Sequence, residues 1–255
     1  MRFVVLRKKK LIAMISVVIA VLIVIPCAVM GVTVSVFSKT KSRKLPVYAV
    51  DTDEKAVAIS FDCAWGVDYT DKLLGIMKEE DVVCTFFCVE FWTKKYPEYV
   101  KKISEHGHEI GTHSATHPHM SKLSEKDVEK ELTTSSQAIE EITGKKVEVF
   151  RPPYGEYNDA VLGVAERLGL YSIQWDVDSL DWKNLGASEI TDRVLKKVKN
   201  GSIVLFHNQG LHTSEALPLI IKGLKSRGYA FKRIGDLIYR NDYIIKADGR
   251  QTKNK

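Results

Sequence analysis

Residues 56–62 read AVAISFD, and this stretch begins the pattern that decides the fold. Its large and small side chains alternate, which is typical of a β-strand. Residues 69–80 follow with helical spacing of their apolar side chains. Residues 82–89 (VVCTFFCV) then form a continuous apolar run that suits a buried parallel strand. Strand, helix and strand in this order predict a β/α unit whose two strands share one parallel sheet.

The same alternation continues to about residue 240. Further strands are predicted over residues 109–112, 147–151, 171–176, 202–207 and 229–233. Further helices are predicted over residues 96–103, 124–144, 159–168, 188–198 and 217–227. About seven β/α units predict an α/β fold, a parallel sheet with helical cover that is either open or closed into a barrel. In both cases the functional site should lie at the carboxyl ends of the strands.

The net charge of +6 comes from one end of the chain. Residues 1–44 hold nine basic residues and no acidic ones, which leaves 29 basic against 32 acidic residues, a net charge of −3, in residues 45–255. The charge therefore does not indicate a nucleic-acid-binding face, and we expect no nucleic-acid partner. Four cysteines are too few for a scaffold held together by disulfides.

Residues 11–38 are 28 consecutive uncharged residues between lysines. A helix needs about 20 apolar residues to cross a bilayer, whereas a signal-peptide core has about 7–15. We therefore predict a cytoplasmic stub and a single-pass transmembrane anchor in residues 1–38, with the folded domain outside the cell membrane. Cleavage after Gly31, which would give a secreted protein, is the alternative. The rest of the chain is predicted to be a polar linker (39–55), the domain (56–240) and a flexible basic tail (241–255).

Polar and titratable residues recur where the predicted strands end. In chain order they are Asp62, Cys63, His113, His117, Arg151, Asp176, Asp178 and His207. Because the carboxyl ends of parallel strands meet at one end of a barrel, we expect these side chains to gather there.

His113 and His117 are spaced i, i+4, which lets two imidazoles reach one ion from a helical turn. Alone, such a pair is as often two surface histidines. Cys63 is a plausible third ligand, because a thiolate and imidazoles together favour zinc and similar metals. The alternative for Cys63 is a small buried hydrophobic residue, the usual role of a free cysteine.

Asp62 and His207 suit a base and an acid. A carboxylate beside a metal can take a proton from a water whose pKa the ion has lowered, and Arg151 could hold Asp62 ionised. His207 could protonate a leaving amine, with Asp178 orienting its imidazole and holding it protonated. Asp176 and Asp181 could compete with Asp178 for that role. Each of these residues could also belong to a satisfied buried ion pair.

Together these segments resemble the polysaccharide deacetylase family, the NodB-homology or carbohydrate esterase 4 group. The likeness covers roughly residues 56–240, and its five motifs occur in order. They read SFDC (60–63), HSATH (113–117), RPPYG (151–155), DSLDW (178–182) and LFH (205–207). The resemblance implies a distorted seven-stranded (β/α) barrel and metal-dependent removal of acetyl groups from N-acetylated sugars.

The resemblance also implies roles for single residues. Carried over by position, the base is Asp62, the acid is His207 and the metal ligands are His113 and His117. The backbone N–H of Tyr154 would be the oxyanion donor, and Trp182 and Leu205 would form the wall around the acetyl methyl group. Zinc is the first expectation for the divalent metal, with cobalt, manganese or nickel as alternatives. Cell-wall glycan is the expected partner of a monomeric catalytic domain.

One position departs from the family pattern. The second aspartate of the first motif, a metal ligand in typical members, is Cys63 here. The DCAWG stretch at residues 62–66 looks like the sporulation-type (PdaB-like) subgroup of Gram-positive bacteria. Either Cys63 binds the metal, or a water fills the gap, or the site binds metal poorly; we expect the first.

Two functional classes follow from these residues. The first is a membrane-tethered hydrolase that removes acetyl groups from wall sugars such as N-acetylglucosamine or N-acetylmuramic acid. The second is a wall-binding protein that kept the groove but has weak or no chemistry. The intact acid, base and histidine pair favour the enzyme, because binding alone needs no acid–base pair.

Overall fold

The computed structural model describes residues 43–254 of the chain. The predicted transmembrane anchor in residues 1–38 therefore lies outside the described residues. Between residues 43 and 254, none of the helices is both long enough and apolar enough to span a bilayer.

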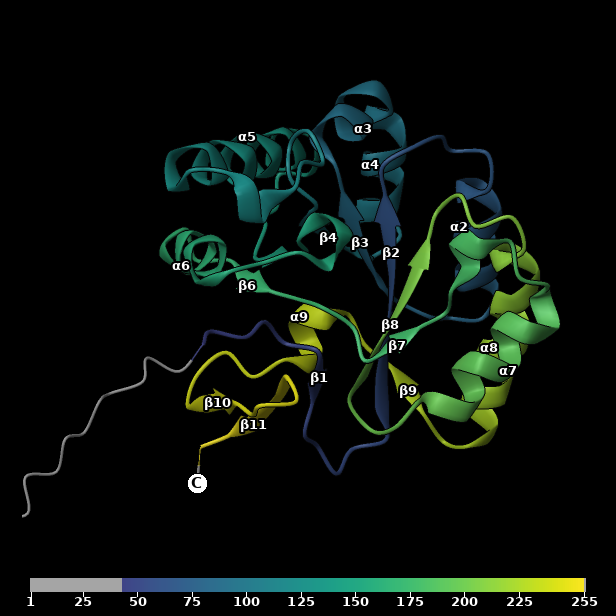
Figure 1. Cartoon of the computed structure of the whole chain (residues 1–255). Helices are drawn as coiled ribbons and strands as arrows, with labels where there is room; N and C mark the ends of the chain where they lie inside the picture. Colours follow the sequence, from purple (N-terminus) through teal and green to yellow (C-terminus); the bar gives the residue numbers. More distant parts are fainter. Residues whose placement is uncertain (1–42, 255) are drawn as a thin grey trace, which may run out of the picture. The chain divides into compact units, whose positions relative to one another are not determined.

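A curled, mainly parallel sheet forms the centre of the domain (Figure 1). Its strands are β1 (Ala49–Val50), β2 (Ala56–Cys63), β3 (Thr85–Cys88), β4 (Glu109–Thr112), β5 (Val149–Phe150), β6 (Tyr171–Ser172), β7 (Val177–Asp178), β8 (Ser202–His207), β9 (Ala230–Phe231), β10 (Tyr243–Ile245) and β11 (Arg250–Lys253). The spatial order is β10-β11-β1-β8-β2-β3-β4-β5-β6, with β7 paired to β8 and β9 paired to β2. Only the β1–β8 and β10–β11 pairs among these are antiparallel.

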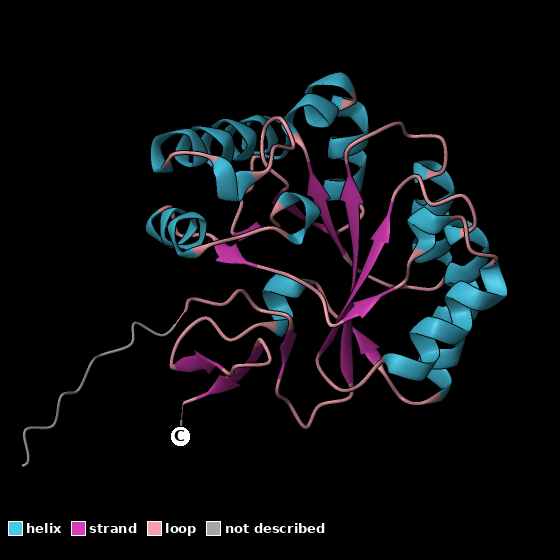
Figure 2. Ribbon diagram, viewed as in Figure 1, coloured by secondary structure: helices cyan, strands magenta, loops and turns pink. Residues whose placement is uncertain are grey.

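Helices surround the strands (Figure 2). They are α2 (Thr70–Glu79), α3 (Glu90–Lys95), α4 (Pro97–Glu105), α5 (Glu125–Thr143), α6 (Asp159–Arg167), α7 (Ala187–Lys197), α8 (Thr213–Ser226) and the short α9 (Ile234–Leu237). In Figure 1, α5 and α6 lie on one side of the central strands, and α2, α7 and α8 lie on the other. The order of strands and helices follows the predicted alternation.

The ends of α5 show how local sequence sets the element bounds. The Ser124 side chain accepts a hydrogen bond from the Asp127 backbone N–H and caps the first turn. Gly144 ends the helix with a left-handed backbone (φ 66°), which glycine adopts without a steric penalty. Both bounds agree with the prediction.

The two faces of β2 pack against different surroundings. Phe61 and Cys63 belong to the large core cluster that includes the buried side chains of α2. Ala58 belongs to a second cluster together with Phe87. Because side chains alternate along a strand, Asp62 shares the inner face with Ala58, and Cys63 shares the outer, helix-facing side with Phe61.

The predicted fold class is confirmed as an α/β fold with a curled parallel sheet, but the number of strands is larger than the seven that were predicted. Within the described residues the sheet has eleven strands, partly because β6 covers only the start of the strand predicted over 171–176 and β7 is a further short strand just after that range. Val47 forms a parallel bridge with Ile173, which brings the N-terminal segment beside the far edge of the sheet. The remaining extra strands come from outside the predicted domain.

The predicted linker and tail are partly folded. The linker predicted over 39–55 contains β1, and its Val47, Ala49 and Val50 side chains are buried. The tail predicted over 241–255 contains β10 and β11, and its Gln251 side chain is buried and hydrogen-bonded to Tyr239. These strands continue the sheet beyond β1, so their backbone groups are paired instead of forming a mobile end.

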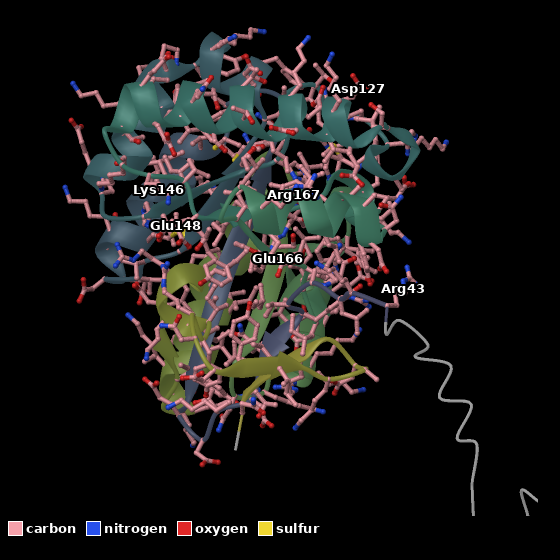
Figure 3. The ribbon with its side chains drawn as sticks, turned by 90° about the vertical axis from the view of Figure 1, so that its left-hand side faces the viewer. Arg43, Asp127, Lys146, Glu148, Glu166 and Arg167 are labelled. Atoms are coloured by element: carbon pink, nitrogen blue, oxygen red, sulfur yellow. The ribbon has the colours of Figure 1, made fainter. Side chains whose placement is uncertain are left out.

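The side of the domain formed by α5 and α6 carries many charged side chains (Figure 3). Glu166 and Arg167 of α6 pair with Lys44 and Glu125 respectively. Lys44 also donates its backbone N–H to the Asp159 carboxylate at 3.0 Å, which attaches the start of the described chain to α6. Exposed pairs of this kind contribute little stability each, about 0–1 kcal/mol.

Candidate active site

A cavity of about 430 Å³ opens at the carboxyl ends of β2, β7 and β8. The predicted site residues that line it are Asp62, His113, His117, Tyr154, Asp178, Trp182, Leu205 and His207. Arg151 lies beneath the cavity in full burial, and Cys63 does not line it. The polar residues at the strand ends therefore gather as expected, with two exceptions: Cys63, and Asp176, which accepts hydrogen bonds from Ser202 and the Ile203 backbone N–H at the start of β8.

Asp62 is an ionised carboxylate held by a buried cation. Its Oδ1 accepts a hydrogen bond from Arg151 Nη1 at 2.8 Å, and the Arg151 guanidinium lies 4.1 Å from the centre of the Phe87 ring. Burial alone would raise the pKa of Asp62, but the charge of Arg151, followed by His113 and His207, lowers it below its usual value. Asp62 is therefore available as a proton acceptor at neutral pH.

His113 presents a lone pair to this carboxylate. Its Nδ1 lies 2.7 Å from the Arg151 carbonyl oxygen, which can only accept, so Nδ1 carries the proton. Burial lowers the pKa of His113 and keeps the ring neutral. Its Nε2 lies 3.5 Å from Asp62 Oδ2, so two electron-rich atoms face each other with no proton between them. A cation is the group that such a pair accommodates.

His117 is neutral as well, and one of its nitrogens is unpartnered. Burial, followed by the nearby His113, lowers the pKa of His117 to about 4. Its Nδ1 is buried and has no hydrogen-bond partner within the described part of the chain. The two rings lie edge to face, with centroids 4.9 Å apart. The i, i+4 spacing predicted a helical turn, but the pair lies on a loop in which Ser114 and His117 both have positive φ.

Cys63 does not join the histidine pair. Its side chain is wholly buried in the outer core cluster with Phe61 and Trp92, and its thiol adjoins that of Cys88. Burial raises the pKa of the Cys63 thiol well above its usual value, so the sulfur stays protonated. The strand continues through residue 63, and this turns Cys63 to the face opposite Asp62.

The residues present fit a metal ion only in part. His113 and His117 supply two neutral imidazoles, and an ion would give the unpartnered nitrogen of His117 a partner. The third family ligand is missing, because Cys63 faces the core. Across residues 43–254 no group of three or more histidine, cysteine, aspartate or glutamate side chains is arranged to hold a metal.

His207 is held by Asp181, and the prediction that Asp178 does this is wrong. Asp181 Oδ1 lies 2.8 Å from His207 Nδ1, and its Oδ2 accepts from the His207 backbone N–H and from Thr213. Burial lowers the pKa of His207, but the hydrogen bond and charge of Asp181 outweigh it and raise the pKa overall. His207 can therefore act as a protonated acid. Asp178 lies in the cavity wall and accepts from the Leu180 backbone N–H.

Tyr154 lies at the cavity in a strained backbone conformation. Its φ is 58°, a left-handed conformation that costs a non-glycine residue about 1–3 kcal/mol. Its ring packs edge-on against His117 and stacks on His119, both with centroids 4.6 Å away. Strain of this kind is found where a backbone group must be aimed at a ligand.

Several cavity residues were not among the predicted site residues. They are Ala64, Trp65, Gly155, Trp175, Asn208 and Gln209. Trp65 is the most exposed of the large hydrophobic side chains in the described chain, at 64%. Its place three residues after Asp62, just beyond the end of the first strand, was the signal available for finding it.

Comparison with known proteins gives a consistent set of relatives. A profile described as "Polysaccharide deacetylase" matches residues 49–173. The uncharacterized protein YlxY of Bacillus subtilis is 35% identical over 76% of this chain, and this chain spans only 60% of it. The peptidoglycan-N-acetylmuramic acid deacetylase PdaA of the same organism is 34% identical, with 76% of each chain covered.

A similar solved structure is that of BA3943 from Bacillus anthracis, described as a CE4 family pseudoenzyme. It has a TM-score of 0.73 and 36% identity, and covers 75% of this chain and 68% of that one. A mutant of BA3943, similar to this chain at 37% identity, is described as having restored enzymatic activity. The fold is therefore similar to that of a protein described as a pseudoenzyme and to that of a mutant described as having restored enzymatic activity.

Proposed function

This chain belongs to the polysaccharide deacetylase family, hydrolases that act on carbon–nitrogen bonds other than peptide bonds, and from that premise we propose that it removes acetyl groups from amino sugars of cell-wall glycan. One observation carries the proposal. The ionised Asp62 and the protonated His207 face the same cavity, each held by a buried group of opposite charge, Arg151 or Asp181. A binding protein has no need of a matched base and acid.

The proposed chemistry divides between these two groups. Asp62 takes a proton from the attacking water, which adds to the acetyl carbonyl carbon. His207 gives its proton to the amide nitrogen as the carbon–nitrogen bond breaks, so the products are acetate and a free amine. A divalent metal, with zinc the first choice and cobalt, manganese or nickel as alternatives, would be held by His113 and His117 and would supply Lewis acidity there.

The surrounding groups suit an acetylated sugar. The backbone N–H of Tyr154 is the proposed donor to the developing oxyanion, and the strained backbone at this residue supports that role. Trp182 and Leu205 are the proposed wall around the acetyl methyl group. Relatives named as peptidoglycan N-acetylmuramic acid and N-acetylglucosamine deacetylases support a wall amino sugar as substrate.

A second candidate function is binding of wall glycan with weak or no turnover. It is favoured by the burial of Cys63 away from the histidine pair, which leaves the metal site one protein ligand short. Likeness to a family member described as a pseudoenzyme supports the same candidate.

We propose that the domain works outside the cell membrane, tethered by residues 11–38, with secretion after cleavage as the alternative. The length of this uncharged segment supports the proposal. A monomeric domain and a role in sporulation are further proposals that rest on the family resemblance alone.

The test is acetate release by the full chain in detergent. Chitooligosaccharides and peptidoglycan fragments would be supplied with zinc or cobalt, and separately with a chelator. Acetate release that chelation abolishes, and that Asp62→Asn removes, supports the deacetylase. Saturable glycan binding without acetate release under any metal supports the binding protein, and absence of both overturns both candidates.

A further inference from the structure

Trp65 is an exposed aromatic side chain at the mouth of the cavity. Its exposed fraction of 64% is high for an indole, which would lower its free energy by burial against other side chains. It lines the same cavity as Asp62 and His207, and its ring lies edge-on to His117 at 5.4 Å between centroids. Because it lines the cavity, the exposed indole is placed to contact a ligand bound there.

The backbone that carries Trp65 is fixed. Asn208 Nδ2 donates to the carbonyl oxygens of Trp65 (3.3 Å) and Gly66 (2.9 Å). The buried Trp92 donates its Nε1–H to the Gly66 carbonyl at 2.7 Å. Gly66 has φ 55°, and a Cβ there would lie 2.3 Å from the Gln209 side chain. The backbone that carries the indole is therefore fixed before any ligand arrives, which reduces the entropy lost on binding.

Trp65 and Trp182 lie on either side of the acid. Trp65 follows β2 and Trp182 follows β7, and both strands pair with β8, which ends at His207. Two strand spacings separate β2 from β7, about 10 Å. In the proposed function Trp182 lies against the acetyl group of the reacting sugar, so Trp65 remains on the other side of the acid, His207. The apolar face of a pyranose ring, with its C–H groups, can stack on such an indole.

We propose that Trp65 forms a second sugar subsite, which binds the pyranose next to the reacting one in a glycan chain. This proposal rests on the proposed function in one respect only, namely that the ligand is a glycan. It makes a chain of two or more sugars the substrate and a single N-acetylated sugar a poor one.

The experiment compares the full-length parent with Trp65→Ala and Trp65→Tyr on N-acetylglucosamine and on chitotetraose. Trp65→Ala should raise KM for chitotetraose about tenfold with kcat within about twofold, because stacking is lost and the reacting groups are untouched. Trp65→Tyr should have a KM close to that of the parent, because a tyrosine ring can also stack on a sugar. Phe91→Ala is the matched control, since Phe91 is 41% exposed and does not line the cavity, and it should leave KM unchanged.

A binding measurement separates this subsite from the proposed activity. Chitotetraose would be titrated into Asp62→Asn, with and without Trp65→Ala, by calorimetry. Weaker binding with Trp65→Ala upholds the subsite even where no acetate is released by the parent. Equal binding in both variants overturns the subsite even where the parent is an active deacetylase. A fall in kcat for Trp65→Ala with KM unchanged also overturns it.

Discussion

Two neighbouring residues of β2 lie in opposite environments. Asp62 lies on the inner face, paired with Arg151 and open to the cavity. Cys63 lies on the outer face, sealed among apolar side chains and protonated. One step along a strand reverses the face, so residue type at a motif position does not decide the role. The role is decided by whether the side chain reaches the cavity and whether a group of opposite charge lies beside it.

The same contrast separates His207 from His108. His207, at the cavity, has a raised pKa because Asp181 holds its proton. His108 packs edge-on against Phe86 on the outer side, and burial lowers the pKa of His108 to about 4. Asp62 and His207 at the cavity each face a group of opposite charge, whereas Cys63 and His108 on the outer side are neutral.

The strongest test of the contrast is removal of charge on the inner face. Asp62→Asn should lower kcat/KM for acetate release about 10²–10⁴-fold, because the proton acceptor is lost. Ser60→Ala is the control: Ser60 precedes Asp62 on the same face and donates only to the Val204 carbonyl. Full activity of Asp62→Asn would mean that another group is the base.

Much of this arrangement follows from sequence pattern. The β/α alternation and the recurrence of Asp62, His113, Arg151 and His207 at strand ends were sufficient to predict one cavity. The prediction was possible because local sequence shows the periodicity of each strand, and because the strands of a parallel sheet all end at the same edge.

Three features did not follow from the pattern, each for a physical reason. Cys63 was taken as the residue after the strand, but β2 includes it, and strand phase decides which face a side chain takes. The choice of Asp181 over Asp178 depends on a turn between two left-handed residues, Leu180 and Asn184. The strands in residues 241–255 form by pairing at the sheet edge, and short charged segments give little intrinsic signal for that.

A smaller effect on activity is expected when the charge of Asp181, which holds His207, is removed. The acid acts when protonated, so activity falls as pH rises through the raised pKa of His207 in the folded protein. Asp181→Asn removes the charge that raises it, so the alkaline limb of kcat/KM should move to lower pH, with about a 10–100-fold loss at pH 8. Asp178→Asn, the matched variant, should move the limb less. The reverse order would restore Asp178 to the role first predicted.

Substitutions of Cys63 on the outer face of β2 should change the stability of the domain and not its activity. Cys63→Ala should cost about 1 kcal/mol of unfolding free energy and leave kcat/KM unchanged. Cys63→Asp places a carboxylate in the apolar cluster and should cost about 2–4 kcal/mol in urea unfolding. A Cys63→Asp protein that keeps its stability, binds zinc more tightly and turns over faster would show that residue 63 reaches the histidine pair.

The smallest effect concerns acid stability through His108. Its folded pKa of about 4 lies below the unfolded value near 6.5, so the unfolded state takes up a proton first as pH falls. The full stability contribution is present above pH 6.5 and is lost as pH falls towards 4, about 1–3 kcal/mol. Asn can accept the same hydrogen bond from the Cys84 backbone N–H, so His108→Asn should remove this part of the pH slope. Urea unfolding at pH 7 and 4.5 measures it. An unchanged slope would mean that His108 is protonated in the fold and that the outer face does hold a charge.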